Sequence, residues 1–138
     1  MDINKILDKD KIPELNTLSP LTLAFLGDSV YEMFVRTKIL AAGNRPANEL
    51  HKIAVGYVKA KAQAIAAHKI LEILTEEETD IYKRGRNTNI HTVPKNADMA
   101  DYRHATALEA LIGYLYLKGE DARLHEILNI AFDTLSRS

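Results

Sequence analysis

Helical periodicity dominates this sequence, and it restricts the fold more than any other feature. In the C-terminal segment, for example, apolar side chains stand at positions 124, 127, 128, 131 and 135, which form one stripe along a helix. No segment convincingly alternates polar and apolar residues as a half-buried strand does, and no hairpin turn is recognisable. We therefore predict an all-α fold of about six or seven helices.

Local start and stop signals divide the first half of the chain into helices. Ser19-Pro20 is typical of a helix N-terminus and Gly43-Asn44 of a C-terminus, which predicts a first helix from Pro20 to about residues 40–42. Pro46 opens the next helix. Gly56 is expected to break or bend it, and an alanine-rich helical stretch follows from about residue 58 to 74.

The second half begins with a capping box. Thr75-Glu-Glu-Glu78 matches that motif and predicts a short helix from Glu76 to Arg84. Residues 85–97 have a loop composition, and long loops in compact domains are usually functional or disordered. Two further helices are expected, one from about residues 98–101 to 118, which ends at Gly119, and one over about residues 121–136.

Length and composition exclude several classes of protein. The 138 residues suffice for one domain, which we expect to span residues 1–138. The chain contains no cysteine, which excludes disulfides and thiolate zinc sites and fits a reducing compartment. The N-terminus does not resemble a secretory signal, and no apolar run approaches the ~20 residues of a membrane span. We therefore expect a soluble cytoplasmic protein with no membrane partner.

Basic residues are concentrated in two segments that contain no acidic residue. Residues 50–71 and 81–97 each hold four lysines or arginines, so the rest of the chain carries −9 although the whole chain carries −1. Such asymmetry suggests a surface that meets a polyanion. For residues 50–71 a solvated helix face is the favoured interpretation. The second segment is different because its charges lie among loop-forming residues.

Two carboxylates lie in apolar stretches that we expect to be helical. Asp28 and Glu109 would each be costly there unless paired with a cation or bound to a metal. Glu32, one turn after Asp28, would add a third negative charge, and three acids suit a hard cation such as Mg²⁺. The alternative is that the acids form buried salt bridges with basic residues such as Arg36 or Arg103. Periodicity alone slightly favours these salt bridges.

Around these two acids the sequence resembles the ribonuclease III family. Phe25-Leu-Gly-Asp-Ser-Val30 is similar to the signature helix of that family, and Leu108-Glu-Ala-Leu-Ile-Gly-Tyr-Leu-Tyr-Leu117 is similar to its second acidic helix. The motifs occur in the family's order, and the resemblance covers about residues 19–119. It implies the family's endonuclease-domain fold and a Mg²⁺-dependent homodimer that cleaves double-stranded RNA.

The chain also resembles one branch of that family. Its 138 residues show no double-stranded-RNA-binding domain, and Lys83-Arg-Gly-Arg-Asn87 with Pro94-Lys-Asn96 resembles Mini-ribonuclease III of Gram-positive bacteria. This implies maturation of both ends of the 23S ribosomal RNA precursor, with a ribosomal protein that presents the substrate as a candidate partner. The catalytic domain must then bind RNA itself. The candidates are Lys83, Arg84, Arg86 and Lys95 for phosphates, and Asn87 and Asn96 for 2′-hydroxyls.

The resemblance also implies roles for individual residues. Asp28 and Glu109 match two acidic positions of the family's metal site and are the predicted catalytic residues and Mg²⁺ ligands. Glu32 is a further candidate ligand. Phe25 matches an apolar position that family dimers use at the subunit interface, although an ordinary core aromatic fits position 25 about equally well.

Two positions depart from the family pattern. Ala24 and Thr106 stand where ribonuclease III proper usually has acidic residues. The number of metal ions is therefore open, and waters and RNA phosphates would have to supply more of the ligands.

Two other classes of function remain as alternatives. The first is a catalytically silent ribonuclease-III-like module that binds RNA during ribosome assembly, but such a module has no reason to keep two costly carboxylates. The second is a helical dimerisation adaptor, which leaves the acid-free segment 81–97 unexplained.

Overall fold

The structure is a computed structural model that describes residues 3–89, 95 and 97–137. Over these residues it contains six α-helices, four short 3-10 helices and no strand, which confirms the predicted all-α fold. The α-helices are α1 (Pro20–Ala42), α2 (Ala47–Val58), α3 (Ala60–Ile70), α4 (Glu76–Arg86), α5 (Met99–Lys118) and α6 (Asp121–Ser136). The 3-10 helices span Ile3–Lys5, Lys9–Lys11, Leu15–Thr17 and Leu71–Ile73. None of the described helices combines the length and apolarity needed to cross a membrane.

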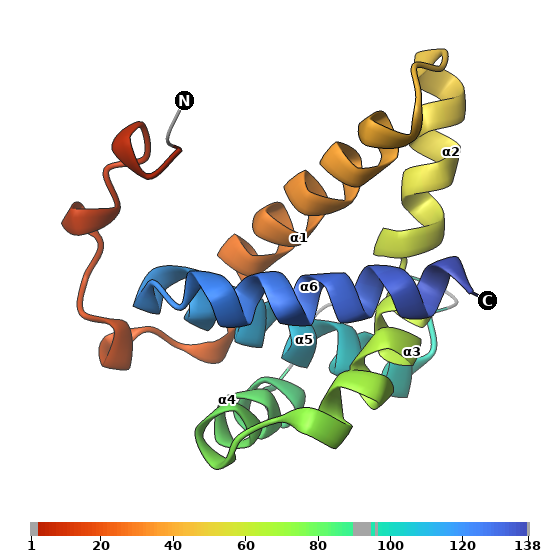
Figure 1. Cartoon of the computed structure of the whole chain (residues 1–138). Coiled ribbons are helices and arrows are strands. Elements are labelled where there is room, and N and C mark those ends of the chain that lie inside the picture. Colours follow the sequence, from red (N-terminus) through yellow and green to blue (C-terminus); the bar gives the residue numbers. More distant parts are fainter. Residues whose placement is uncertain (1–2, 90–94, 96, 138) are drawn as a thin grey trace.

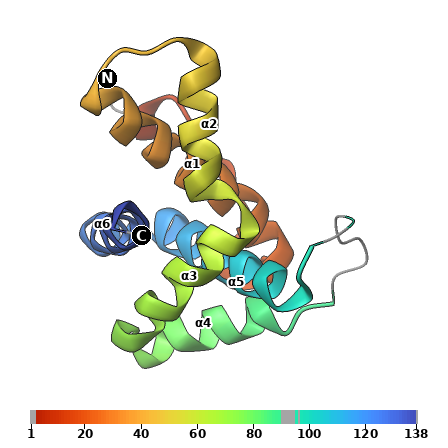
Figure 2. The ribbon, with the colours of Figure 1, turned by 90° about the vertical axis from the view of Figure 1, so that its right-hand side faces the viewer.

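Helix α5 lies at the centre of the fold. It packs against α1, α3, α4 and α6, while α2 packs mainly on α1 (Figure 1). Its fully buried residues Leu108, Leu111 and Ile112 join side chains from α1, α3 and α6 in the main core. The described ends of the α4–α5 connection project on the side of the molecule opposite α6 (Figure 2). Residues on α5 are therefore surrounded by helices from distant parts of the sequence.

The predicted capping signals form in the structure. Ser19 Oγ accepts a hydrogen bond from the Thr22 backbone N–H at 3.2 Å, with Pro20 at the first position of α1. Thr75 and Glu78 form both hydrogen bonds of the capping box of α4. Gly119 ends α5 in the left-handed conformation, at φ 80°. Because these signals are local, the sequence alone located them.

Two glycines behave differently from the prediction. Gly56 does not break its helix, since α2 continues to Val58 and the break falls at Lys59, whose backbone is extended. Gly85 is not the first loop residue, since α4 continues through it to Arg86. Gly85 is buried against α5, and a Cβ there would lie 3.0 Å from Ala107 Cα. This tertiary contact explains why a helix persists through a residue of poor helix propensity.

Helices α1 and α5 approach each other closely at two glycines. A Cβ on Gly27 would lie 1.8 Å from the Glu109 carbonyl oxygen, and a Cβ on Gly113 would lie 2.1 Å from the Leu23 carbonyl oxygen. No side chain fits in either place, so only glycine allows this crossing. Gly27 directly precedes Asp28, and its neighbour across the crossing is Glu109. The crossing thus brings the two predicted catalytic acids to one point.

Candidate active site

The two acids singled out from the sequence lie together. Asp28 on α1 is exposed, and Glu109 on α5 is partly buried beside it. Both the charge of Asp28 and a side-chain hydrogen bond to it contribute to the raised pKa of Glu109, so the two carboxyl groups are close neighbours.

Glu109 is difficult to ionise in this environment. Burial raises the pKa of its carboxyl most, and the negative charge of Asp28 and the hydrogen bond to Asp28 raise it further, to about 8. Without a compensating positive charge, Glu109 is therefore largely protonated at neutral pH. A group of this kind favours the approach of a cation, because a cation allows both carboxylates to be ionised.

The described basic side chains do not supply that cation. Arg36 pairs instead with Glu32, at 2.8 Å between Nη2 and Oε1. Arg103 Nη1 donates to the backbone carbonyls of Arg86 and Thr88, each at 3.2 Å. Within the described ranges, no ion pair reaches Asp28 or Glu109. The salt bridges that periodicity favoured are therefore not formed.

The predicted third acid does not join the pair. Glu32 lies on α1, but its carboxylate is engaged by Arg36. Among the residues that the structure describes, no group of three or more His, Cys, Asp and Glu side chains is placed to hold a metal ion. Ala24 and Thr106, at the usually acidic positions, are both buried. The candidate site thus contains two carboxylates from the described residues.

Two polar residues near Glu109 were not predicted from the sequence. Gln63 on α3 points its Nε2 at Glu109 Oε2, at 3.4 Å. Tyr31 on α1 donates its hydroxyl to the Tyr57 carbonyl at 2.9 Å, and burial raises the pKa of this phenol, with a further contribution from the charge of Glu109. Gln63 did leave a trace in the sequence, because it is the one uncharged polar side chain between Lys61 and His68 in an alanine-rich stretch.

The predicted RNA-binding residues that the structure describes lie at the C-terminal end of α4 and in the connection that follows it. Lys83, Arg84, Asn87 and Lys95 are exposed, and Arg86 is half-buried. Asn96 lies outside the described residues. No described acidic side chain forms an ion pair with Lys83, Arg84 or Arg86. Gly85, between these basic residues, packs on Ala107 and Ala110, which flank Glu109 on α5. The basic end of α4 therefore packs against the part of α5 that carries Glu109.

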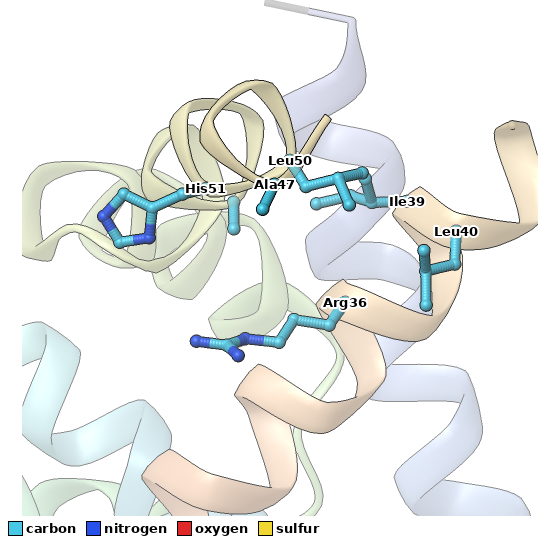
Figure 3. A pocket seen from close by; sticks show the side chains of 7 residues that line it. Arg36, Ile39, Leu40, Ala47, Leu50 and His51 are labelled. Carbon is cyan, nitrogen blue, oxygen red and sulfur yellow. The ribbon is translucent and has the colours of Figure 1, made fainter. Parts of the chain in front are cut away.

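Phe25 is not a core residue. Its side chain is 82% exposed on α1, three residues before Asp28, so the alternative of an ordinary core aromatic is wrong. Further along α1, a pocket of about 370 Å³ lies between α1 and α2 (Figure 3). It is lined by Arg36, Ile39, Leu40, Ala47, Leu50, His51 and Ala54. Neither acid of the pair lines this pocket, so the acids form a separate site.

The donor set fits a hard divalent cation. Carboxylate oxygens are the ligands that Mg²⁺ prefers, and Mg²⁺ commonly uses one or two carboxylates and completes its shell with waters and phosphate oxygens. The acid pair has no described basic partner, and one buried oxygen beside it, Gln63 Oε1, accepts no hydrogen bond from the described protein. Two ionised acids at this position require positive charge from outside the described chain.

Residues 21–120 match the family model of the ribonuclease III domain. The chain is 53% identical over 119 residues to the Mini-ribonuclease 3 of a Thermoanaerobacter species, which covers 86% of this chain and 84% of that protein. It is 50% identical over 121 residues to the Mini-ribonuclease 3 of Symbiobacterium thermophilum, at 88% and 93% coverage.

A solved structure agrees with these sequences. The crystal structure of a Fusobacterium nucleatum protein superposes with a TM-score of 0.77 at 38% identity, and the match covers 83% of this chain and 92% of that one. The class is therefore that of ribonuclease III endonuclease domains, which are generally metal-dependent. More narrowly, the chain belongs to the Mini-ribonuclease 3 family, and it is an endoribonuclease.

Proposed function

We propose that this protein is a Mg²⁺-dependent endoribonuclease that cleaves double-stranded RNA, and that it matures the 5′ and 3′ ends of the 23S ribosomal RNA precursor in the cytoplasm. The observation that carries the proposal is that Asp28 and Glu109 lie together at the close crossing of α1 and α5, and that no described basic side chain forms an ion pair with either acid. We further propose that residues 1–138 form one catalytic domain. The choice of 23S precursor as substrate rests on the resemblance to Mini-ribonuclease III.

In this proposal Asp28 and Glu109 hold Mg²⁺. When bound, the ion polarises the scissile phosphate and lowers the pKa of an attacking water. Asp28 is exposed and would meet the solvent and the substrate. Glu109 is partly buried among the packed helices, which restrict its side chain. Glu32 is left out of the proposed ligand set, because its carboxylate pairs with Arg36. With only two acids from the protein, RNA phosphate oxygens and waters complete the coordination.

RNA is bound by the catalytic domain itself. Lys83, Arg84, Arg86 and Lys95 contact backbone phosphates, which position a duplex without reading its sequence. Asn87 reaches 2′-hydroxyls across the shallow minor groove, and Asn96 is assigned the same role. The support is positional, because the basic end of α4 packs against the part of α5 that carries Glu109.

The active form is a homodimer with Phe25 at its interface. The side chain of Phe25 is 82% exposed, and burying it against a second copy would stabilise the dimer. Because a duplex has two strands, a two-fold axis would place one copy of the acid pair near each strand. A ribosomal protein bound to the precursor RNA is the proposed presenting partner.

The test compares four incubations of the purified protein. Duplex RNA and its separated single strands are each incubated with Mg²⁺ and with a chelator. The proposal predicts endonucleolytic products from the duplex with Mg²⁺ only. Cleavage of the single strands at a similar rate, or undiminished duplex cleavage in the chelator, would contradict it.

A further inference from the structure

The side chain of Gln63 is buried although it is polar. It lies in the first turn of α3 with 3% of its surface exposed, between the buried Ala62 and Ala64. Of the buried polar and charged side chains that the structure describes, the others are Glu78 and Thr106. Buried polar groups are retained where each donor and acceptor has a partner, so the partners of Gln63 indicate why an amide is present.

The amide of Gln63 connects three helices. Its Nε2 donates to the Val58 carbonyl at the end of α2, at 2.8 Å, and also points at Glu109 Oε2 on α5, at 3.4 Å. The orientation of the amide is defined, because a carbonyl can only accept and a flipped amide would place two oxygens against each other. The hydrogen bond to Val58 therefore fixes the direction from which Gln63 meets Glu109.

The other end of the amide has no protein partner. Gln63 Oε1 is buried and accepts no hydrogen bond from the described residues. A buried acceptor without a donor is unfavourable, and such groups are often found where a ligand or a bound water supplies the hydrogen. This acceptor belongs to the same rigid amide that contacts Glu109.

We propose that Gln63 is a positioning residue for the cation site: its Nε2 holds the Glu109 carboxylate in place, and its Oε1 accepts a hydrogen bond from a water of the bound cation. The inference rests on the proposed function of Asp28 and Glu109. Residues that hydrogen-bond to a metal ligand orient that ligand, and their loss typically weakens metal affinity 10–100-fold. Because the proposed site has only two protein carboxylates, the orientation of each one by its neighbours affects cation binding strongly.

Two variants test this role. Gln63→Met keeps the length of the side chain and removes the amide, whereas Gln63→Asn keeps the amide but is too short to reach Val58 and Glu109 together. Tyr82→Phe is the matched control, because it removes another buried hydrogen bond, the 2.6 Å contact between Tyr82 and His104. The measurements are the Mg²⁺ concentration for half-maximal duplex cleavage, the KM for RNA, and the rise in melting temperature on adding Mg²⁺.

For both Gln63 variants we expect about a tenfold higher Mg²⁺ requirement. The Mg²⁺-induced rise in melting temperature should shrink, while KM for RNA at saturating Mg²⁺ stays within about twofold because a buried side chain does not touch RNA. Tyr82→Phe should alter none of the three quantities beyond a lower starting melting temperature. A wild-type Mg²⁺ requirement and melting-temperature rise in either folded Gln63 variant would overturn the inference.

The unmodified protein provides a test that does not depend on a variant folding. Titration with Mg²⁺ in the absence of RNA should shift the side-chain amide resonances of Gln63 in NMR spectra. Unchanged resonances at saturating Mg²⁺ would overturn the inference. If the wild-type protein neither binds Mg²⁺ nor cleaves duplex RNA, the proposed function itself fails. If it does both and only the Gln63 measurements are unaffected, the positioning role alone fails.

Discussion

Replacing Glu109 with glutamine is expected to stabilise the cation-free protein at alkaline pH. Glutamine has the shape of the protonated acid and can still hydrogen-bond to Asp28, but it never becomes charged. In the folded wild-type protein the pKa of Glu109 is raised from 4.5 to about 8 by burial and by Asp28. The unfolded chain releases this proton near pH 4.5, so the folded state binds more protons between these two pH values.

The sign of the pH effect follows from this difference. Below about pH 4.5 the carboxyl is protonated in both states and costs nothing. As the pH rises towards 8 the folded wild-type protein loses stability, and above about 8 the loss is complete. Each pKa unit corresponds to about 1.4 kcal/mol, which caps the loss at about 5 kcal/mol. A loss of a few kcal/mol is therefore expected across this pH range.

Urea unfolding in a chelator at several pH values between 5 and 9 measures this effect. The Glu109→Gln variant should lie within about 1 kcal/mol of the wild-type protein near pH 5 and exceed it increasingly up to about pH 8. Adding Mg²⁺ at pH 8 should restore the unfolding free energy of the wild-type protein and leave that of the variant nearly unchanged. Glu49→Gln, at an exposed position, is the control and should follow the wild-type curve. If the difference in unfolding free energy between Glu109→Gln and wild type did not change with pH, the raised pKa of Glu109 would be refuted.

Three further predictions concern the surroundings of the acid pair. Replacing Lys83, Arg84 and Arg86 together with alanine should weaken duplex RNA binding about equally for different sequences and lower the slope of log K against log[salt] by ~0.7–0.9 per lost phosphate contact. An unchanged salt slope with a lower melting temperature would show that these residues only stabilise α4. Phe25→Glu should yield monomers of about half the wild-type mass in sedimentation, and a wild-type sedimentation coefficient would exclude this residue from the interface. Gly27→Ala should cost several kcal/mol in unfolding free energy and abolish cleavage, since its Cβ would overlap the backbone of α5; near-normal stability would contradict the close crossing.

The sequence predicted the elements that depend on local chemistry. The capping signals at Ser19, Thr75 and Gly119 act within a few residues, and each helix end they predicted is present. Gly56 and Gly85 misled the prediction because a glycine's effect depends on what lies next to it. Gly56 has no other part of the protein within reach of a Cβ, and its helix simply continues, while Gly85 is held in a helix by its contact with α5.

The candidate site was predictable only in part. Asp28 and Glu109 were found because acids within apolar stretches are unusual, and because the flanking motifs resemble a family. The sequence favoured a salt bridge with Arg36 or Arg103, and it could not show that these two arginines are engaged elsewhere. Gln63 was missed for a similar reason. Its contact with Glu109 joins residues that are 46 positions apart in the sequence, and local sequence patterns do not predict such contacts.

Single-turnover cleavage of duplex RNA by Asp28→Asn tests the central claim most directly. Asparagine keeps the size of the side chain and removes its charge, so the fold and the RNA-binding surface should survive while the cation is lost. At saturating Mg²⁺ we predict a fall in cleavage rate of at least about 10³-fold, with an RNA Kd within about threefold of wild type. A variant that binds RNA normally and cleaves it at close to the wild-type rate would show that the carboxylate pair is not the catalytic cation site.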